Sequence, residues 1–427
     1  MKISPARRSA FEILLRIERD KSFSSILLPE FEKDLSPKDR ALCHQLTFGV
    51  LRRRMLLDRM ISALVATEKL DLEVLMALRI GLFQLRFLDR IPPFSAINES
   101  VELVKFGRKT SAKGLVNAVL RRLSKENAPP EFGDDTDRLA VETSHPHWFV
   151  EKWKRDFGDN ASEMLRSNNL QAPAAFRVLP DDAIPDPNFA ANYPKSEFVD
   201  ECLFASTSDI SALTASDKVY FQDEGSQLVA QAVFTAETET FLDVCAAPGG
   251  KTTMIAGHMM SGLDLFVAGD RYWPRVQSLQ QNCRRQNSAF VNILQYDAAE
   301  AIPIANHSID VVLVDTPCTG TGTIRRNPEI RYFIEPETFA SINIKQRQIL
   351  VNASKVVKPG GRLIYSSCSL EKEENEDICN GFLREHADFM FLRPRVPERF
   401  ITSDGFARTF PYRDGMDGFF LAEFRHG

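Results

Sequence analysis

The chain has 427 residues, of which 44% are hydrophobic and 26% are charged, a composition typical of a globular protein with two or three domains of ~150 residues each. It has no apolar run long enough to span a bilayer, and its first residues lead into an amphipathic pattern instead of the apolar core of a secretory signal. These features argue against a membrane or secreted protein, and we expect a soluble protein of the cytoplasm with no membrane partner.

The seven cysteines are scattered along the chain, and no two of them form a C-x-x-C pair. Neither a disulfide framework nor a structural zinc site is indicated, so we expect no metal. Any cysteine with a special role is expected to act as a free thiol.

Charge is distributed unevenly along the sequence. Residues 1–129 contain 24 Lys and Arg against 15 Asp and Glu, whereas the remainder contains 29 against 43. The net charge of -5 therefore conceals a basic N-terminal part. Such a part is suited to binding nucleic acid, although a set of solvated helix faces would give the same count.

The N-terminal part shows helical patterns. Ser4 and Ser36 each place a hydroxyl before a proline, an arrangement typical of a capped helix start. Leu42, Leu46 and Val50 then recur at helical spacing. Further periodic apolar stretches at 72–88, 97–106 and 115–123 predict an all-helical bundle, and the polar, proline-bearing segment 124–135 marks its end.

After a short amphipathic helix expected at 147–157, the sequence up to Lys218 is rich in proline and polar residues, and its pattern does not define a fold. Beyond it, apolar strand-like runs alternate with helical stretches. This alternation predicts a doubly wound, largely parallel α/β sheet of the Rossmann-like kind. Five strands are expected, at residues 241–245, 265–268, 291–294, 309–314 and 362–365.

The residues that follow these strands are candidates for a ligand site, because the ligands of open α/β sheets bind beyond the carboxyl ends of the strands. The first strand ends in a turn of small residues, 243–252, which fits neither the Walker pattern nor G-x-G-x-x-G. Asp270, Asp297 and Asp315 end or follow the next three strands. Alternatively, the turn binds no ligand and the carboxylates are ordinary helix caps. A nicotinamide dehydrogenase would share the turn and the carboxylate at Asp270.

Two cysteines are expected at the same edge of the sheet. Cys318 follows the fourth strand within the motif 315–328, and Cys368 follows the fifth, ahead of Glu373, Glu374 and Asn375. The other cysteines outside the first turn are expected to be inert buried side chains: Cys43, Cys202, Cys283 and Cys379.

These motifs resemble those of the Sun-type family of RNA cytosine-5 methyltransferases, and most closely its bacterial branch with an N-terminal NusB-like domain that acts on small-subunit ribosomal RNA. The resemblance thins between about 181 and 218. It is carried by the segments 243–252, 315–328, 367–369 with Glu373–Asn375, 222–227 and 416–420, and in the helical bundle by 96–99 and 115–122.

The resemblance implies an all-helical NusB-like RNA-binding domain at 1–129, a small linking and RNA-binding subdomain at 137–218, and a methyltransferase domain at 219–427. It also implies that S-adenosyl-L-methionine is the cofactor and that ten residues hold it. These are Cys245, Ala246, Ala247, Pro248, Gly249, Gly250, Lys251, Asp270, Asp297 and Asp315.

The resemblance further implies that Cys368 is the nucleophile that attacks carbon 6 of cytosine and that Cys318 assists release of the product. DNA cytosine methyltransferases place the nucleophile in a Pro-Cys motif, so Cys318 is the alternative nucleophile. The chain departs from the family pattern at Thr316, where alanine is usual, and at Ser367, where threonine is common. Neither difference removes a reacting group.

The expected substrate is a cytosine of small-subunit ribosomal RNA in a loop or single strand, because the base must leave its stack to react. The same chemistry on transfer RNA, or a non-catalytic role in RNA binding or ribosome assembly, are the alternatives. We also expect that removing residues up to Pro129 weakens RNA binding without harming cofactor binding. Candidate phosphate contacts are Arg52, Arg53, Arg54, Lys105, Arg108, Lys109, Lys113, Arg121 and Arg122.

Overall fold

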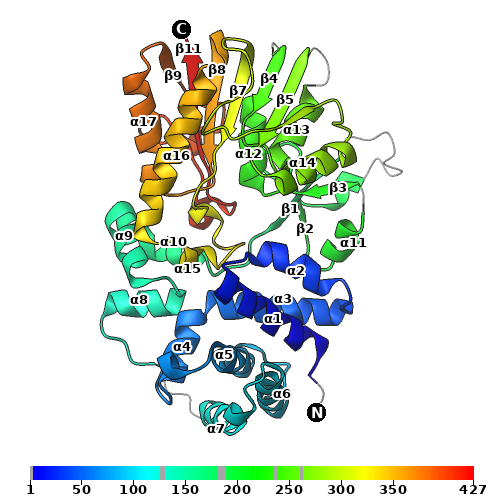
Figure 1. Ribbon diagram of the computed structural model, residues 1–427, viewed down its shortest axis with the longest axis vertical. Helices are drawn as coiled ribbons and strands as arrows, with labels where there is room; N and C mark the ends of the chain where they lie inside the picture. Colours follow the sequence, from blue (N-terminus) through cyan, green and yellow to red (C-terminus); the bar gives the residue numbers. More distant parts are fainter. Residues whose placement is uncertain (1–2, 126–129, 180–188, 217, 235–237, 260–262) are drawn as a thin grey trace. The chain divides into compact units, whose positions relative to one another are not determined.

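The computed structural model describes residues 3–125, 130–179, 189–216, 218–234, 238–259 and 263–427. Within it the chain divides into two compact units (Figure 1). The helical unit comprises Met1–Leu170 together with Ile324–Phe333, and the sheet unit comprises Gln171–Thr323 and Ile334–Gly427. The first unit therefore includes ten residues that come from the middle of the second in sequence.

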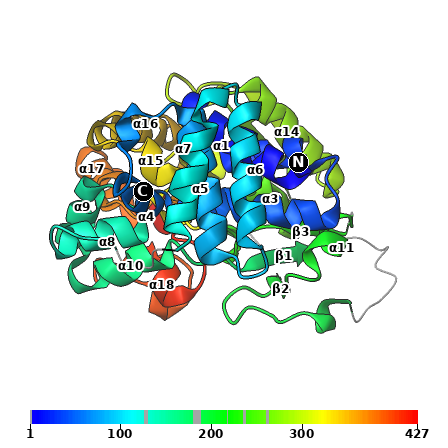
Figure 2. The ribbon, with the colours of Figure 1, turned by 90° about the horizontal axis from the view of Figure 1, so that it is seen from below.

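The helical unit consists of helices, as the periodic apolar stretches predict. Helices α5, α6 and α7 pack side by side (Figure 2). The helices of this unit are α1 (Pro5–Asp20), α2 (Ser24–Glu32), α3 (Pro37–Arg52), α4 (Arg54–Ser62), η1 (Thr67–Lys69), α5 (Leu72–Phe87), α6 (Pro93–Phe106), η2 (Thr110–Ala112), α7 (Lys113–Leu123), α8 (Asp135–Thr143), α9 (His147–Phe157), η3 (Gly158–Asn160), α10 (Ala161–Ser167) and α15 (Ile330–Phe333).

The two predicted serine caps behave differently. Ser36 accepts a hydrogen bond from the backbone N–H of Asp39 at 3.2 Å, so it caps α3 as predicted. Ser4 precedes α1 but makes no capping hydrogen bond. Its backbone N–H donates to Glu99 at 2.8 Å and its hydroxyl accepts from Arg7 at 3.0 Å, so tertiary contacts replace the local cap.

The core of the helical unit is apolar and contains a few buried, paired charges. Arg79 is 3% exposed and forms ion pairs with Asp58 at 2.7 Å and Glu18 at 2.8 Å. The attraction of these two carboxylates outweighs the desolvation of the guanidinium and raises the pKa of Arg79. Helix α9 has the predicted bounds, and the three-part domain division proposed from the sequence stays a prediction.

The sheet unit begins with a small antiparallel sheet of β1 (Ala174–Val178), β2 (Leu203–Ala205) and β3 (Val219–Phe221), in the order β2-β1-β3. Strands β1 and β2 lie within the range whose fold the sequence pattern did not define, and β3 begins directly after it.

The large sheet contains the five predicted strands, and all of their pairings with one another are parallel. They are β4 (Thr240–Asp243), β5 (Leu265–Asp270), β6 (Asn292–Gln295), β7 (Ile309–Asp315) and β8 (Val357–Ser367). Strand β4 lies between β5 and β7, so the strand order reverses at its carboxyl end. Such a switch point is where doubly wound folds bind ligands.

Three further strands complete the large sheet in antiparallel orientation and were not predicted. Strand β11 (Phe420–His426) pairs with β8, and β9 (Phe389–Leu392) and β10 (Ala407–Arg408) pair with β11. Their addition makes the sheet mixed instead of wholly parallel.

Helices cover both faces of the large sheet and create two apolar cores. On β4, Phe241 packs into the core formed with α12, α13 and α14, whereas its neighbour Leu242 packs into the core formed with α16 and α17. The helices of the sheet unit, most of them labelled in Figure 1, are η4 (Phe189–Asn192), α11 (Ile210–Thr214), α12 (Glu224–Val233), α13 (Gly250–His258), α14 (Trp273–Arg285), η5 (Thr321–Thr323), α16 (Pro336–Ser354), η6 (Lys372–Glu374), α17 (Glu376–Glu385), η7 (Glu398–Phe400) and α18 (Pro411–Asp414).

Candidate functional site

A cavity of about 300 Å³ lies at the carboxyl ends of the parallel strands in the sheet unit. The structure brings seven of the twelve predicted site residues to its wall. They are Cys245, Ala247, Asp270, Asp297, Asp315, Cys318 and Cys368. This size is at the lower end of the range for small-molecule sites.

The other five predicted residues, Ala246, Pro248, Gly249, Gly250 and Lys251, lie in the same turn after β4 and at the start of α13. Gly249 has φ +104°, a conformation that favours glycine, and a Cβ there would approach Leu279 to 2.8 Å. The turn is held from α14, because Arg275 donates to the carbonyl of Ala247 at 2.6 Å and Asn282 to that of Pro248 at 2.8 Å.

Two of the three strand-end carboxylates have an arginine partner. Asp270 is 6% exposed, accepts from the backbone N–H of Tyr272 at 3.2 Å, and lies 3.4 Å from Arg275. Asp297 accepts from the backbone N–H of Ala299 at 3.0 Å and pairs with Arg271 at 2.9 Å. The arginines offset part of the negative charge at this end of the cavity.

Asp315 has a different set of partners. Its Oδ2 binds the ammonium of Lys251 at 2.7 Å, and its Oδ1 accepts from the hydroxyl of Ser366 at 2.7 Å. Burial lowers the pKa of Lys251, but the charge and hydrogen bond of Asp315 outweigh it, and the pKa lies above its usual value. Lys251 therefore stays charged beside the cavity.

The two cysteines lie together. The Sγ atoms of Cys318 and Cys368 are 3.1 Å apart, and both thiols are free and half-buried. The hydrogen bond with Cys368 and burial together hold the pKa of Cys318 well above its usual value. Cys318 is therefore a neutral thiol at neutral pH and can donate a hydrogen bond to its neighbour.

Glu374 ties the two cysteine-bearing loops together. Its carboxylate accepts from the backbone N–H of Thr319 at 2.9 Å, from the Thr319 hydroxyl, from the Ser369 hydroxyl at 2.7 Å, and from the side-chain amide of Gln346 at 3.0 Å. Glu374 is fully buried, and this burial raises the pKa of its carboxyl. One side chain thus bonds to the residue after Cys318 and to the residue after Cys368.

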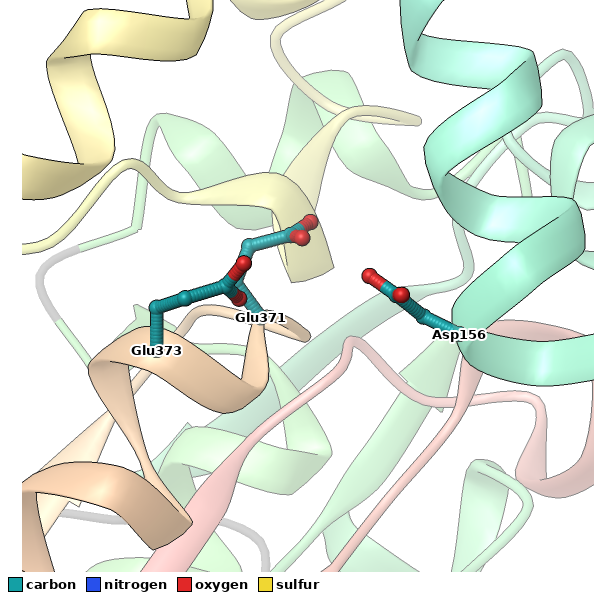
Figure 3. Close-up of side chains that lie close together, drawn as sticks. All are labelled: Asp156, Glu371 and Glu373. Carbon is teal, nitrogen blue, oxygen red and sulfur yellow. The ribbon is translucent and has the colours of Figure 1, made fainter.

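Glu371 and Glu373 precede Glu374 in the chain, on either side of Lys372. Figure 3 shows their carboxylates side by side, with oxygens within 4.8 Å of each other. Asp156, also drawn there, belongs to α9 of the helical unit.

Two glycines allow the loops to approach closely. Gly322 donates to the carbonyl of Cys368 at 2.9 Å and accepts from the backbone N–H of Gly418 at 2.9 Å. A Cβ at Gly322 would lie 2.2 Å from the carbonyl oxygen of Gly418, which backbone movement alone could relieve. The segment 416–420, noted in the sequence without a role, therefore packs against the loop that carries Cys318.

Several residues of the cavity wall were not singled out from the sequence. Tyr272 and Arg275 follow Asp270 by two and five positions, so they could have been found from the strand-end rule. Lys345 and Ile349 reach the wall from α16, four residues apart, and no local signal distinguishes them from other helical residues.

Five of the nine candidate phosphate contacts are half-buried and have partners inside the helical unit. Arg52 donates to the carbonyl of Arg325 at 2.8 Å, the Arg53 guanidinium lies 4.5 Å from the ring of Phe87, and Arg54 pairs with Glu18 at 3.2 Å. Lys109 and Lys113 pair with Asp71 at 3.0 Å and Glu102 at 3.4 Å. The exposed candidates are Lys105, Arg108, Arg121 and Arg122.

Family models match residues in both units. The model of the 16S rRNA methyltransferase RsmB/F family matches residues 230–425, that of the NusB family matches 4–125, and that of the RsmF/B-like ferredoxin-like domain matches 145–180. The fold inferred from the sequence, a helical NusB-like bundle, a small linking domain and a Rossmann-like methyltransferase domain, is thereby confirmed. Among the described residues, no helix has the length and apolar character needed to cross a membrane.

Individual relatives cover nearly the whole chain. The "Probable ribosomal RNA small subunit methyltransferase B" of Bacillus subtilis strain 168 is 32% identical over 100% of this chain and 99% of its own. The ribosomal RNA small subunit methyltransferase B of Sodalis glossinidius is 30% identical over 93% of this chain and 92% of its own. The crystal structure of the protein PH0851 matches with a TM-score of 0.84 at 25% identity and covers 99% of both chains.

The resemblance drawn from the sequence motifs is confirmed by these matches. The chain belongs to the RsmB/F family of RNA methyltransferases, with a NusB-family domain and a ferredoxin-like domain preceding its methyltransferase domain.

Proposed function

We propose that this enzyme transfers a methyl group from S-adenosyl-L-methionine to carbon 5 of a cytosine in 16S ribosomal RNA, through a covalent bond between Cys368 and the base. The observation that carries the proposal is the pair of thiols 3.1 Å apart in the cavity that the strand-end carboxylates also line. A methyltransferase acting on an exocyclic oxygen or nitrogen has no use for such a pair.

The charges around the two cysteines support Cys368 as the nucleophile. Asp315 holds the pKa of Lys251 above its usual value against the effect of burial, and the ammonium also interacts electrostatically with Cys368. A cation near an attacking sulfur stabilises the negative charge that the sulfur carries during the reaction. Cys318, whose pKa is raised, stays protonated and can donate to the Cys368 sulfur.

In the proposed reaction the Cys368 thiolate forms a bond to carbon 6 of cytosine, which moves the electron pair of the ring double bond toward carbon 5. S-Adenosyl-L-methionine, when bound, would supply an electrophilic methyl group to carbon 5 and leave as the neutral thioether. Solvent water then takes the carbon 5 proton, and the electron pair of that C–H bond restores the double bond between carbons 5 and 6 and expels Cys368 as thiolate. We assign Cys318 to this last step, in which its thiol assists departure of the Cys368 sulfur.

The cavity fits a nucleoside-type cofactor. Asp270 ends the strand next to β4, where a carboxylate can accept hydrogen bonds from ribose hydroxyls. Asp297 follows β6, one strand farther, and the turn from Cys245 to Lys251 offers closely approachable backbone. We propose that these residues and Asp315 hold S-adenosyl-L-methionine, as the sequence motifs implied.

The substrate class rests on the N-terminal part and on the relatives. A NusB-family match, a basic N-terminal charge balance and relatives named for small-subunit ribosomal RNA all support an RNA partner of that kind. We propose that the enzyme works in the cytoplasm, where this RNA is processed. Transfer RNA and a purely non-catalytic assembly role are the competing assignments.

The test separates the two cysteines by trapping the intermediate. The full-length protein is incubated with S-adenosyl-L-methionine and small-subunit RNA, and protein–RNA adducts are resolved by denaturing electrophoresis. Cys318→Ser is expected to accumulate an adduct, because Cys368 can attack but release is slowed. Cys368→Ser is expected to form none.

Two controls make the result unambiguous. Cys245→Ser changes a thiol of the same cavity that has no part in the proposed covalent step, and it should yield no trapped adduct. Bisulfite mapping of RNA from cells with and without the protein identifies the modified cytosine. An adduct from Cys368→Ser but not from Cys318→Ser would reverse the assignment, and no adduct from either variant would refute the covalent mechanism.

A further inference from the structure

The segment Ile324–Phe333 directly follows the loop that carries Cys318, yet it belongs to the helical unit. In sequence it adjoins the sheet unit at both ends, but the partners of its side chains lie more than 160 positions away. Of the four charged residues in the segment, Glu329 and Arg331 have no exposed surface.

Glu329 is held from the start of α2. Its Oε1 accepts from the backbone N–H of Ser24 at 2.6 Å and from the Ser24 hydroxyl at 2.8 Å. Arg331 is held by residues at the end of α8 and just after α10. It donates to the carbonyl of Thr143 at 2.7 Å, to the side chain of Asn169 at 2.8 Å, and to the carbonyl of Asn168 at 3.2 Å.

The neighbouring residues strengthen the attachment. Tyr332 donates to the carbonyl of Leu51 at 2.8 Å, and the ring of Phe333 packs edge-on against Phe23 with centroids 5.6 Å apart. Arg325 offers its carbonyl to Arg52. We call Ile324–Phe333 the anchor segment, because it is bound to α2, α3 and the end of α8 by directional contacts.

The chain just before the anchor segment is also held by hydrogen bonds, in this case within the sheet unit. Gly322 belongs to the sheet unit and is hydrogen-bonded to the backbone of Cys368 and of Gly418, both at 2.9 Å. Only Thr323 separates it from the anchor segment. Four residues before Gly322 is Cys318, so there is little slack chain between the helical unit and this thiol.

Burying a charged side chain has an unfavourable desolvation free energy, so stability alone does not explain why Glu329 and Arg331 attach this segment. Burial lowers the pKa of Arg331 to about 10, which reflects the cost of removing its charge from water. Apolar side chains of similar size often replace buried ionic groups without loss of stability. Apolar packing allows a segment to slide along its own axis. The directional hydrogen bonds of Glu329 and Arg331 fix the segment in that direction.

We propose that Glu329 and Arg331 are positioning residues through which the helical unit sets the placement of the Cys318 thiol. The inference rests on the proposed function in so far as it concerns product release by Cys318. It makes the helical unit, the predicted site of RNA contact, a determinant of the chemical step as well as of binding.

The test compares Arg331→Lys with a matched control, Arg79→Lys. Both arginines are buried in the helical unit and make three side-chain hydrogen bonds. Only Arg331 belongs to the anchor segment, so a general weakening of the helical unit affects both variants alike. Ser24→Ala is a milder third variant, since it removes one hydrogen bond to Glu329 and leaves the backbone one.

The first measurement does not depend on catalysis. The full-length proteins are treated briefly with iodoacetamide, and alkylation of the Cys318 peptide is compared with that of the Cys245 peptide by mass spectrometry. Arg331→Lys is expected to change this ratio several-fold, and Arg79→Lys to leave it at the wild-type value. Equal ratios in all three proteins would overturn the proposal.

The second measurement is kinetic. Arg331→Lys is expected to lower kcat about ten- to a hundredfold, because misplacing a reacting group by ~1 Å has an effect of this size, with KM for RNA nearly unchanged. It should also accumulate the protein–RNA adduct expected of Cys318→Ser. If Arg331→Lys does not fold, Ser24→Ala must show the same changes in weaker form, and wild-type behaviour of that variant would overturn the proposal.

The two proposals fail separately. If Cys318→Ser forms no adduct but Arg331→Lys still changes the alkylation ratio, the proposed release step is wrong and the positioning role stands. If Cys318→Ser forms the adduct but Arg331→Lys and Arg79→Lys behave alike in both measurements, the positioning role is wrong and the proposed reaction stands.

Discussion

Replacing Glu374 with alanine should separate the two cysteine-bearing loops. The carboxylate accepts four hydrogen bonds, two of them from hydroxyl groups. The hydroxyls of Thr319 and Ser369 are 3.3 Å apart and can bond to each other once the carboxylate is gone. Gln346 keeps its bond to the carbonyl of Pro317 at 3.0 Å.

Two buried donors then have no acceptor, the backbone N–H of Thr319 and one N–H of the Gln346 amide. An unsatisfied buried donor costs ~1–3 kcal/mol, so the two together cost about 2–6 kcal/mol. Part of this loss is offset, because burial of the carboxylate is itself unfavourable and raises its pKa. We expect the free energy of unfolding to fall by about 2–4 kcal/mol, or the Tm by about 4–16 °C for a unit of this size.

Calorimetry measures the loss of stability, and hydrogen exchange of the peptide that contains Thr319 locates it. Glu374→Gln is the matched variant, because its amide oxygen can still accept from Thr319 and its NH₂ can donate to the hydroxyls, and it should lose less than half as much. Glu373→Ala changes the preceding, only half-buried side chain and should have a small effect. Wild-type unfolding and unchanged exchange at Thr319 in Glu374→Ala would refute the reasoning.

Three further predictions concern the cofactor turn and the helical unit. Asp270→Ala should weaken binding of S-adenosyl-L-methionine by about 1.5–3 kcal/mol through loss of hydrogen bonds to a charged acceptor, and unchanged affinity in calorimetry would remove Asp270 from the site. Burial raises the pKa of Asp243 from 3.8 to about 7, so the folded state holds a proton that the unfolded state releases. The free energy of unfolding should therefore fall by about 3 kcal/mol as the pH rises from 4 to 7, and Asp243→Asn should flatten that slope in urea titrations. A protein lacking residues 1–129 should unfold at lower temperature and aggregate, because it loses Ser24 and the other partners of the anchor segment; a soluble truncated protein with wild-type cofactor affinity would contradict this.

The site was predictable from sequence because it follows from a rule about position. Parallel strands bring their carboxyl ends to one edge, so Asp270, Asp297, Cys318 and Cys368 could be grouped before any coordinates were known. The other residues of the cavity wall could not be predicted from this rule. Lys345 reaches the cavity from the middle of α16, where its place in the sequence resembles that of any helical lysine.

The contacts of the helical unit could not be predicted at all from local patterns. Tyr332 bonds to Leu51 across 281 positions, and helical periodicity carries no information about such a pairing. For the same reason Arg52, expected to contact phosphate, instead binds the carbonyl of Arg325, 273 positions away. The sequence also predicts that the N-terminal part can be removed without harm to the cofactor site. Because Ser24 and Leu51 of the removed part bind the anchor segment, these contacts favour the opposite result, which is the truncation prediction above.

The anchor segment also bears on how the chain matures on the ribosome. Residues up to Leu170 are synthesised well before Ile324–Phe333, so the helical unit emerges with the places for Glu329 and Arg331 empty. At ~5–20 residues per second, the ~150 intervening residues take on the order of 10–30 s to appear. During that interval the nascent helices expose the polar and aromatic partners of the anchor segment, and their final structure forms only after more than three quarters of the chain has been translated.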